Sequence, residues 1–179
     1  MNKTYLLIDG YNVIHAWHLV EKWQDDMAAA RDELISIAAD YSAYRDMIAI
    51  VVFDAPSAVG METEELISGV TVVFTDEEET ADSYIERTSY RLVRERAEVF
   101  VVTSDAMEQS VILGAGAYRI SAREWKTMIA QTQKQRREKW QSRPLGDRSE
   151  LAGRLSDEVM AKLEAMRRME IQSSTKGKK

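Results

Sequence analysis

The fold of this chain is decided near its start, where a short apolar run ends in a carboxylate, Tyr5-Leu6-Leu7-Ile8-Asp9. Short runs of this kind are typical of strands that are buried on both faces of a sheet. Three later runs rich in β-branched residues repeat the pattern over 47–54, 70–75 and 99–105, and a weaker one lies at 117–121. We therefore expect about five strands.

Helical stretches separate these strands. Apolar residues recur at helical spacing over 25–44 and 80–96. A third stretch, 106–113, ends at Gly114, the usual residue for a helix C-cap. Strand and helix in alternation indicate parallel strands joined by right-handed crossovers. The sequence thus predicts an α/β fold, an open parallel sheet of about five strands with helices on both faces.

Composition excludes several classes of protein. The chain has 179 residues and no Cys, so a disulfide framework, a thiol nucleophile and a Cys-ligated metal site are all excluded. No apolar stretch approaches the roughly 18 residues of a membrane span, and the N-terminus does not resemble a signal peptide. We expect a cytoplasmic protein with no membrane partner.

The region after residue 121 has a different character. A long charged helix is predicted over 122–140, followed by a break rich in turn residues and by an amphipathic helix over about 150–169. The last residues are small, polar and basic, and are expected to be disordered. We divide the chain into an α/β domain, a basic helical extension and a tail, at 1–124, 125–172 and 173–179.

Acidic residues gather where the predicted strands end. Asp9, Asp54 and Asp105 each close a strand, and parallel strands bring these ends to one edge of the sheet, where open α/β folds bind their ligands. Asp82 lies in the first turn of the helix after the third strand, and Glu86 follows one turn later on the same face. Carboxylates forced together repel one another, and a hard divalent cation relieves that repulsion. We therefore predict an Mg²⁺ or Mn²⁺ site.

A simpler interpretation exists for each acid taken alone. An Asp at the end of a strand is often a turn former or a helix N-cap. Four acids from separate segments at one edge favour the metal site over four unrelated caps. The run Glu77-Glu78-Glu79 carries no such argument, and we expect it to be a solvated acidic loop.

Charge is distributed unevenly along the chain. The net charge of −6 argues at first sight against a nucleic-acid partner. Residues 1–125 hold 10 basic and 23 acidic side chains, a net of −13, whereas residues 126–179 hold 14 and 7, a net of +7. The basic part suits phosphate contacts with aromatic stacking, although a merely solvated helix is the alternative. The residues concerned are Lys134, Arg136, Arg137, Lys139, Arg143 and Arg148, with Trp125 and Trp140 among them.

Four motifs stand out along the chain: Leu7-Ile8-Asp9-Gly10-Tyr11-Asn12-Val13-Ile14, Phe53-Asp54-Ala55, Glu79-Thr80-Ala81-Asp82-Ser83-Tyr84-Ile85-Glu86 and Val102-Thr103-Ser104-Asp105. Taken together, these motifs closely resemble the YacP-like NYN-domain family of PIN-like nucleases. The match runs in order from about Lys3 to Glu124 and continues into the basic C-terminal helices. The bacterial members include a ribosome-associated endoribonuclease that cleaves messenger RNA.

The resemblance implies a PIN-like NYN fold and a metal-dependent endoribonuclease that acts on mRNA at the ribosome. It implies an acidic core of Asp9, Asp82 and Asp105 that holds Mg²⁺ or Mn²⁺, with Asn12 orienting or assisting it and Asp54 as a further metal ligand. Glu86 and Glu108 are candidates for contacts to the metal ligands. Two alternatives remain open, a non-catalytic RNA- or ribosome-binding module of the same fold and a small-molecule phosphohydrolase. The oligomeric state is not predicted.

Overall fold

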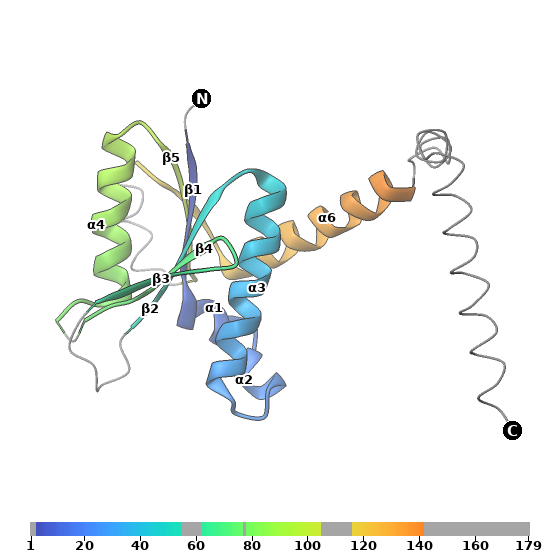
Figure 1. The fold of residues 1–179 in the computed structure, drawn as a ribbon, viewed down its shortest axis with the longest axis horizontal. Coiled ribbons are helices and arrows are strands. Elements are labelled where there is room, and N and C mark those ends of the chain that lie inside the picture. The colour runs from blue at the N-terminus through green and yellow to red at the C-terminus, as the bar shows by residue number, and fades with distance from the viewer. Residues whose placement is uncertain (1–2, 55–61, 77, 105–115, 142–179) are drawn as a thin grey trace, which may run out of the picture. The chain divides into compact units, whose positions relative to one another are not determined.

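The computed structural model describes residues 3–54, 62–76, 78–104 and 116–141. The chain divides into two compact units, residues 1–134 and 135–179. The sheet and the helices that cover it belong to the first unit (Figure 1).

The first unit is built on a single six-stranded sheet with the order β3-β4-β2-β1-β5-β6. Five strands are parallel and β3 alone runs antiparallel, to β4. The predicted α/β fold with an open, mostly parallel sheet is confirmed, with one strand more than expected. The strands are β1 (Thr4–Asp9), β2 (Ile48–Phe53), β3 (Thr63–Ile67), β4 (Val70–Phe74), β5 (Glu98–Val102) and β6 (Tyr118–Ile120).

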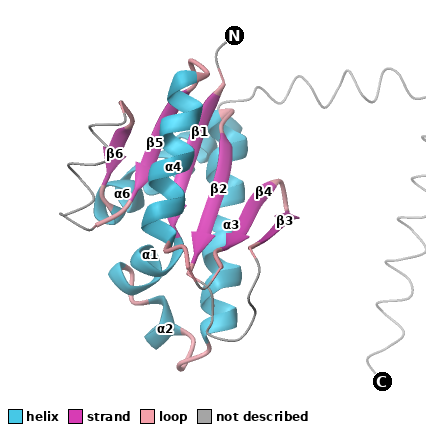
Figure 2. Cartoon of the chain, turned by 90° about the vertical axis from the view of Figure 1, so that its left-hand side faces the viewer, coloured by secondary structure: helices cyan, strands magenta, loops and turns pink. Residues whose placement is uncertain are grey.

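Helices cover both faces of this sheet, as predicted. On one face α4 packs over β5, β1 and β2, and on the other face lie α1, α3 and the start of α6 (Figure 2). The predicted helices over 25–44, 80–96 and 122–140 are confirmed to within two residues at each end. The helices are α1 (Gly10–Ala16), α2 (Leu19–Lys22), α3 (Met27–Arg45), α4 (Ala81–Arg94) and α6 (Ala122–Gln141).

Some predictions fall on residues that the structure does not describe. The helix over 106–113, the helix over 150–169 and the disordered tail at 173–179 all lie outside the described residues. They stay predictions.

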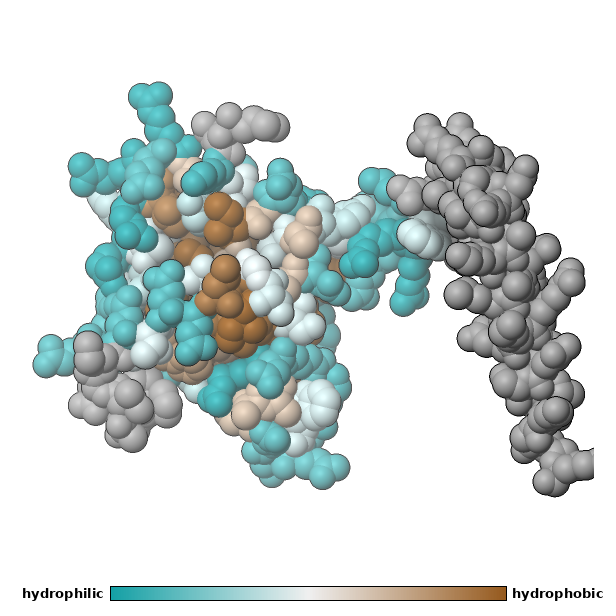
Figure 3. Space-filling model, in the orientation of Figure 1, coloured by the Kyte–Doolittle hydropathy of each residue, from teal (hydrophilic) through white to brown (hydrophobic). Residues whose placement is uncertain are grey.

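The edge strand β3 was not predicted, because all five of its residues are exposed and no buried apolar run marks it. It joins β4 through Ser68 and Gly69, which have φ values of 52° and 83°. Two positive φ values in a two-residue turn match the twist of a hairpin. Leu66 in β3 is 77% exposed. Figure 3 shows apolar side chains gathered over this part of the sheet edge, with hydrophilic residues around them.

The start of α6 is fixed in the core of the first unit. Ser121 and Glu124 cap the helix reciprocally, and the hydrogen bonds from Ser121 lower the pKa of the Glu124 carboxyl. Trp125 is completely buried, with its ring centroid 5.1 Å from that of Trp17 and 5.9 Å from that of Tyr41. The expectation that Trp125 stacks on nucleic-acid bases is therefore wrong, because its ring completes the protein core.

The predicted extension over 125–172 thus begins inside the packed body. The Trp17 indole N–H also donates to the Ala122 carbonyl oxygen, at 2.9 Å, which ties α1 to the first turn of α6. Within the described ranges, no helix has both the length and the apolar character needed to span a bilayer.

Candidate active site

The polar residues singled out by the sequence lie where the strand order of the sheet reverses. From β1 the chain proceeds to β2 on one side and returns later to β5 on the other, so the switch point lies between β1 and β5. In the parallel register Asp9 pairs with Val52 and Ile8 pairs with Val102. Asp9, Asp54 and Ser104 therefore lie at the same carboxyl edge, the place where open α/β sheets bind ligands.

Asp9 is buried, with 6% of its surface exposed, and it caps α1. Its Oδ1 accepts a hydrogen bond of 3.1 Å from the backbone N–H of Asn12. Gly10, which follows Asp9, has no room for a side chain, because a Cβ there would lie 2.2 Å from Cε1 of Phe53. This close approach of α1 to β2 fixes the Asp9 carboxylate at the edge of the sheet.

Asn12 connects the two strands that flank the switch point. Its Oδ1 accepts a hydrogen bond of 2.8 Å from the backbone N–H of Ser104, which follows β5. The Ser104 hydroxyl oxygen in turn accepts from the Ala122 N–H at 3.3 Å, where α6 begins. Asn12 thus holds the backbone immediately before Asp105, which itself lies outside the described residues.

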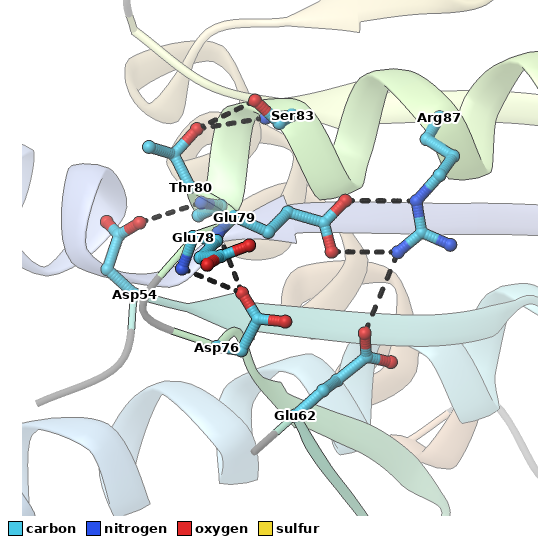
Figure 4. A network of polar contacts seen from close by, with 9 residues as sticks. Asp54, Glu62, Asp76, Glu78, Glu79, Thr80, Ser83 and Arg87 are labelled. Carbon is cyan, nitrogen blue, oxygen red and sulfur yellow. Dashed lines mark hydrogen bonds and ion pairs between the residues drawn. The ribbon is translucent and has the colours of Figure 1, made fainter. Parts of the chain in front are cut away.

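Asp54 positions the helix that carries Asp82. Asp54 Oδ1 accepts a hydrogen bond of 2.7 Å from the Ala81 N–H, the first residue of α4, and Thr80 Oγ1 accepts from the Ser83 N–H at 3.2 Å (Figure 4). Asp82, the second residue of this helix, is exposed, and so is Glu86 one turn later. The fixed first turn of α4 therefore presents the Asp82 carboxylate to solvent.

Both Asp9 and Asp54 thus hold the start of a helix: Asp9 is the N-cap of α1, and Asp54 accepts from the first N–H of α4, whose N-cap is Thr80. A carboxylate oxygen that accepts one hydrogen bond keeps a further lone pair. Capping fixes these side chains in place and leaves the metal-site prediction standing.

The loop before α4 is held by a polar network. Asp76 Oδ1 accepts from the N–H groups of Glu78 and Glu79, at 2.9 and 2.8 Å. Arg87 donates to both oxygens of Glu79, at 3.0 and 2.8 Å, and lies 3.7 Å from a Glu62 oxygen (Figure 4). Donation to Glu79 raises the pKa of the Arg87 guanidinium. The expectation of a wholly solvated acidic loop is wrong for Glu79, which is half-buried and paired with Arg87.

The metal ligands can be assessed only in part. Among the residues that the structure describes, no three His, Asp or Glu side chains are close enough to form a metal site. Asp105 and Glu108 are not among those residues, so the metal site expected around Asp9, Asp82 and Asp105 stays a prediction.

The predicted RNA-contacting residues lie on α6 as far as they are described. They are all exposed, and the ring of Trp140 is 75% exposed. Arg143 and Arg148 lie outside the described residues. Those described are Lys134, Arg136, Arg137, Lys139 and Trp140.

Comparison with known proteins identifies the family. The model of the YacP-like NYN domain matches residues 6–168. The chain belongs to the YacP-like NYN family. This family is nuclease-like, as the four sequence motifs imply. YacP of Bacillus subtilis is 38% identical over 168 residues, which cover 91% of this chain and 96% of YacP.

Two solved structures extend the likeness to the fold. The crystal structure of Rae1 (YacP) from Bacillus subtilis is 36% identical, with a TM-score of 0.64, and the match covers 96% of this chain and 98% of that one. A single-residue mutant of the same protein gives 32% identity and a TM-score of 0.65, over 91% of this chain and 99% of that one. The NYN fold predicted from the motifs is therefore confirmed.

Two contacts that hold the candidate site of this NYN domain were not found by sequence reasoning. The partner of Asn12 is Ser104, 92 residues away, and only the neighbouring positions of β1 and β5 bring them together. Arg87 reaches Glu79 across eight residues because the loop before α4 folds back along the helix. The capping box of α6, in contrast, is visible in the sequence as Ser121-Ala122-Arg123-Glu124.

Proposed function

We propose that this chain is a divalent-metal-dependent endoribonuclease that hydrolyses phosphodiester bonds of RNA in the cytoplasm, with mRNA on the ribosome as its substrate. The observation that supports this most is the arrangement at the switch point. There, a nuclease-like fold fixes Asp9, Asp54 and Asn12 by hydrogen bonds, and Asp82 is exposed in the first turn of α4, the helix that Asp54 holds.

The donor set at this edge fits a hard divalent cation, since it consists of carboxylate and amide oxygens without sulfur or imidazole. Asp9, Asp82 and Asp105 would hold Mg²⁺ or Mn²⁺, with Asp54 as the next candidate. When bound, such an ion polarises a phosphate oxygen and lowers the pKa of a coordinated water.

The contribution of the protein itself is positioning. The Asn12 N–H and the close packing of Gly10 fix the Asp9 carboxylate. The Asn12 side chain fixes the backbone that leads to Asp105, and Asp54 fixes the first turn of α4. Groups held by their neighbours in this way do not need to reorganise when substrate binds, which lowers the barrier to reaction.

Substrate binding must overcome the negative charge of the first 125 residues, a net of −13. The exposed cations of α6, among them Arg136, Arg137 and Lys139, supply positive charge for phosphate contacts, and Trp140 supplies an exposed ring. The same surface suits docking to the RNA of a ribosome. Binding of this kind weakens steeply with salt.

Asp82→Asn tests the proposal, because this residue is exposed and its replacement leaves the packing of α4 unchanged. We expect the variant to keep the melting temperature of the wild type and to lose RNA cleavage. Asp32→Asn, at an exposed position in α3, is the matched control and should cleave like the wild type. Each protein is incubated with translating ribosomes and with free RNA, with Mg²⁺ and with a chelator. A folded Asp82→Asn protein that still cleaves RNA would refute the assignment.

The same experiment separates the two alternatives. A non-catalytic binding module binds RNA or ribosomes in the presence of chelator and shows no cleavage even with Mn²⁺. A small-molecule phosphohydrolase releases phosphate from nucleotides or sugar phosphates and leaves RNA intact.

A further inference from the structure

A small basic and aromatic surface at the end of α4 has no role in the site described above. This surface, the α4 patch, consists of Tyr90, Arg91 and Arg94, which with Glu95 line a surface depression. Both arginines are exposed, and the ring of Tyr90 is 55% exposed. Within the described part of the chain, neither arginine makes an ion pair with a carboxylate.

The charge of the α4 patch is unusual for its surroundings. Four of the ten basic residues of the first 125 fall within ten positions, 87–96, although those 125 residues carry a net charge of −13. Arg87 is neutralised by Glu79 and Glu62, whereas Arg91 and Arg94, further along the same helix, are not. The negative end of the helix dipole favours cations in the last turn, but it does not account for an exposed aromatic ring beside them.

The α4 patch lies on the same helix as Asp82, towards its other end. Residues 83, 87, 90, 91 and 94 recur at helical spacing and so share one face of α4. At 3.6 residues per turn this face is turned by about a third of a turn from Asp82, which lies in the first turn of the helix. Twelve residues separate Asp82 from Arg94, a rise of about 18 Å along the helix axis. At about 3.4 Å per stacked nucleotide this length corresponds to about five nucleotides.

We propose that the α4 patch binds single-stranded RNA about five nucleotides from the cleavage point, with a base stacked on Tyr90 and phosphates on Arg91 and Arg94. The position of the cleavage point rests on the proposed function, whereas the binding itself does not. Arginine suits this role because its planar, permanently charged guanidinium donates to two phosphate oxygens at once. Exposed aromatic rings next to cations are the usual means of holding single strands without reading their sequence.

The test measures equilibrium binding of a fluorescent 12-nucleotide single-stranded RNA to the full chain, in chelator, over a series of salt concentrations. The variants are Arg91→Gln, Arg94→Gln and the double replacement, and the control is Arg45→Gln. Arg45 is an exposed cation in the last turn of α3, on the opposite face of the sheet, so its loss changes the net charge equally. Far-ultraviolet circular dichroism and thermal melting establish that each variant folds.

We expect the slope of log affinity against log salt to become shallower by about 0.7 for each patch arginine removed and by about 1.4 for the double variant. The control should retain the wild-type slope. Tyr90→Ala should weaken binding about fivefold or more, whereas Tyr90→Phe, which keeps the ring, should bind like the wild type.

Three results would overturn the proposal. The slope of the double variant could match that of the control, the wild type could fail to bind RNA in chelator, or the variants could lose a protein partner while binding RNA normally. Because binding is measured without metal, its outcome is separate from that of the proposed function. If the patch variants show a shallower salt slope and the wild type cleaves no RNA, the α4 patch is supported and the nuclease function is refuted. If the wild type cleaves RNA and the salt slopes are unchanged in the variants, the nuclease function is supported and the α4 patch is refuted.

Discussion

Replacing Gly10 by alanine adds one methyl group where α1 approaches β2 most closely. That Cβ would lie 2.2, 2.5 and 2.9 Å from three ring atoms of Phe53, whereas ordinary contacts begin at 3.4 Å. The ring cannot move aside freely, because it is completely buried and stands between the rings of Tyr11 and Phe74, at centroid distances of 5.1 and 5.4 Å. The methyl group therefore overpacks the core beside Asp9.

Two opposing terms set the size of the effect. Gly10 is helical and its φ is not positive, so without a clash alanine would stabilise the fold by about 0.5–1 kcal/mol. Overpacking a well-packed core costs about 1–3 kcal/mol, and contacts this short belong at the upper end. We expect Gly10→Ala to lower the free energy of unfolding by about 1–2 kcal/mol and to reduce RNA cleavage, since Asp9 is displaced with α1.

A double-mutant cycle with Phe53→Val isolates the clash. Valine lacks the three ring atoms, so in that background Gly10→Ala should stabilise the fold by about 0.5–1 kcal/mol. The effect of the same methyl group thus changes sign, with a coupling of about 1.5–3 kcal/mol. Urea denaturation of the four proteins measures it. Additive effects of the two replacements, within about 0.5 kcal/mol, would refute the packing argument.

Two further predictions concern the core and its pH dependence. Trp125→Ala should cost about 3–5 kcal/mol of unfolding free energy, whereas Trp140→Ala should stay within about 0.5 kcal/mol, and similar losses in urea denaturation would contradict the burial difference. Partial burial opposes ionisation of Glu33, but hydrogen bonds from Lys22 (2.6 Å) and Trp23 (2.5 Å) more than offset it and lower the pKa of its carboxyl. This stabilisation is present above the ordinary pKa of 4.5 and is lost as the pH falls through the folded value. The difference in free energy of unfolding between the wild type and Glu33→Gln should therefore shrink from pH 7 to pH 3. If urea denaturation gives a constant difference across this range, the interpretation is contradicted.

The sequence predicts those strands that are buried in the sheet, because their residues form continuous apolar runs. The strands β1, β2, β4 and β5 are marked by apolar runs because both of their faces are covered. Strand β3 has no apolar run. The sequence feature that points to it is the dipeptide Ser68-Gly69, which is typical of a turn. Trp125 was misassigned because it lies next to a basic segment, and charge counting cannot tell which face of a helix is buried.

The candidate site was predicted in position but only partly in detail. The edge location of Asp9 and Asp54 follows from strand ends in a parallel sheet, which alternation alone predicts. The hydrogen bond from Ser104 to Asn12 forms because β5 lies beside β1 in the sheet. The pattern of apolar residues along the sequence does not predict this order of strands. Contacts that depend on strand order need the folded chain.

The edge strand β3 has a consequence for how the protein behaves at high concentration. Among the described strands it has a neighbour on one side only, so its other side presents backbone donors and acceptors to any second chain, beside the exposed Leu66. Glu64 and Glu65 place two negative charges on the same five-residue strand, and antiparallel pairing of two copies would bring four carboxylates together. Their mutual repulsion opposes self-association, and concentrated salt screens that repulsion.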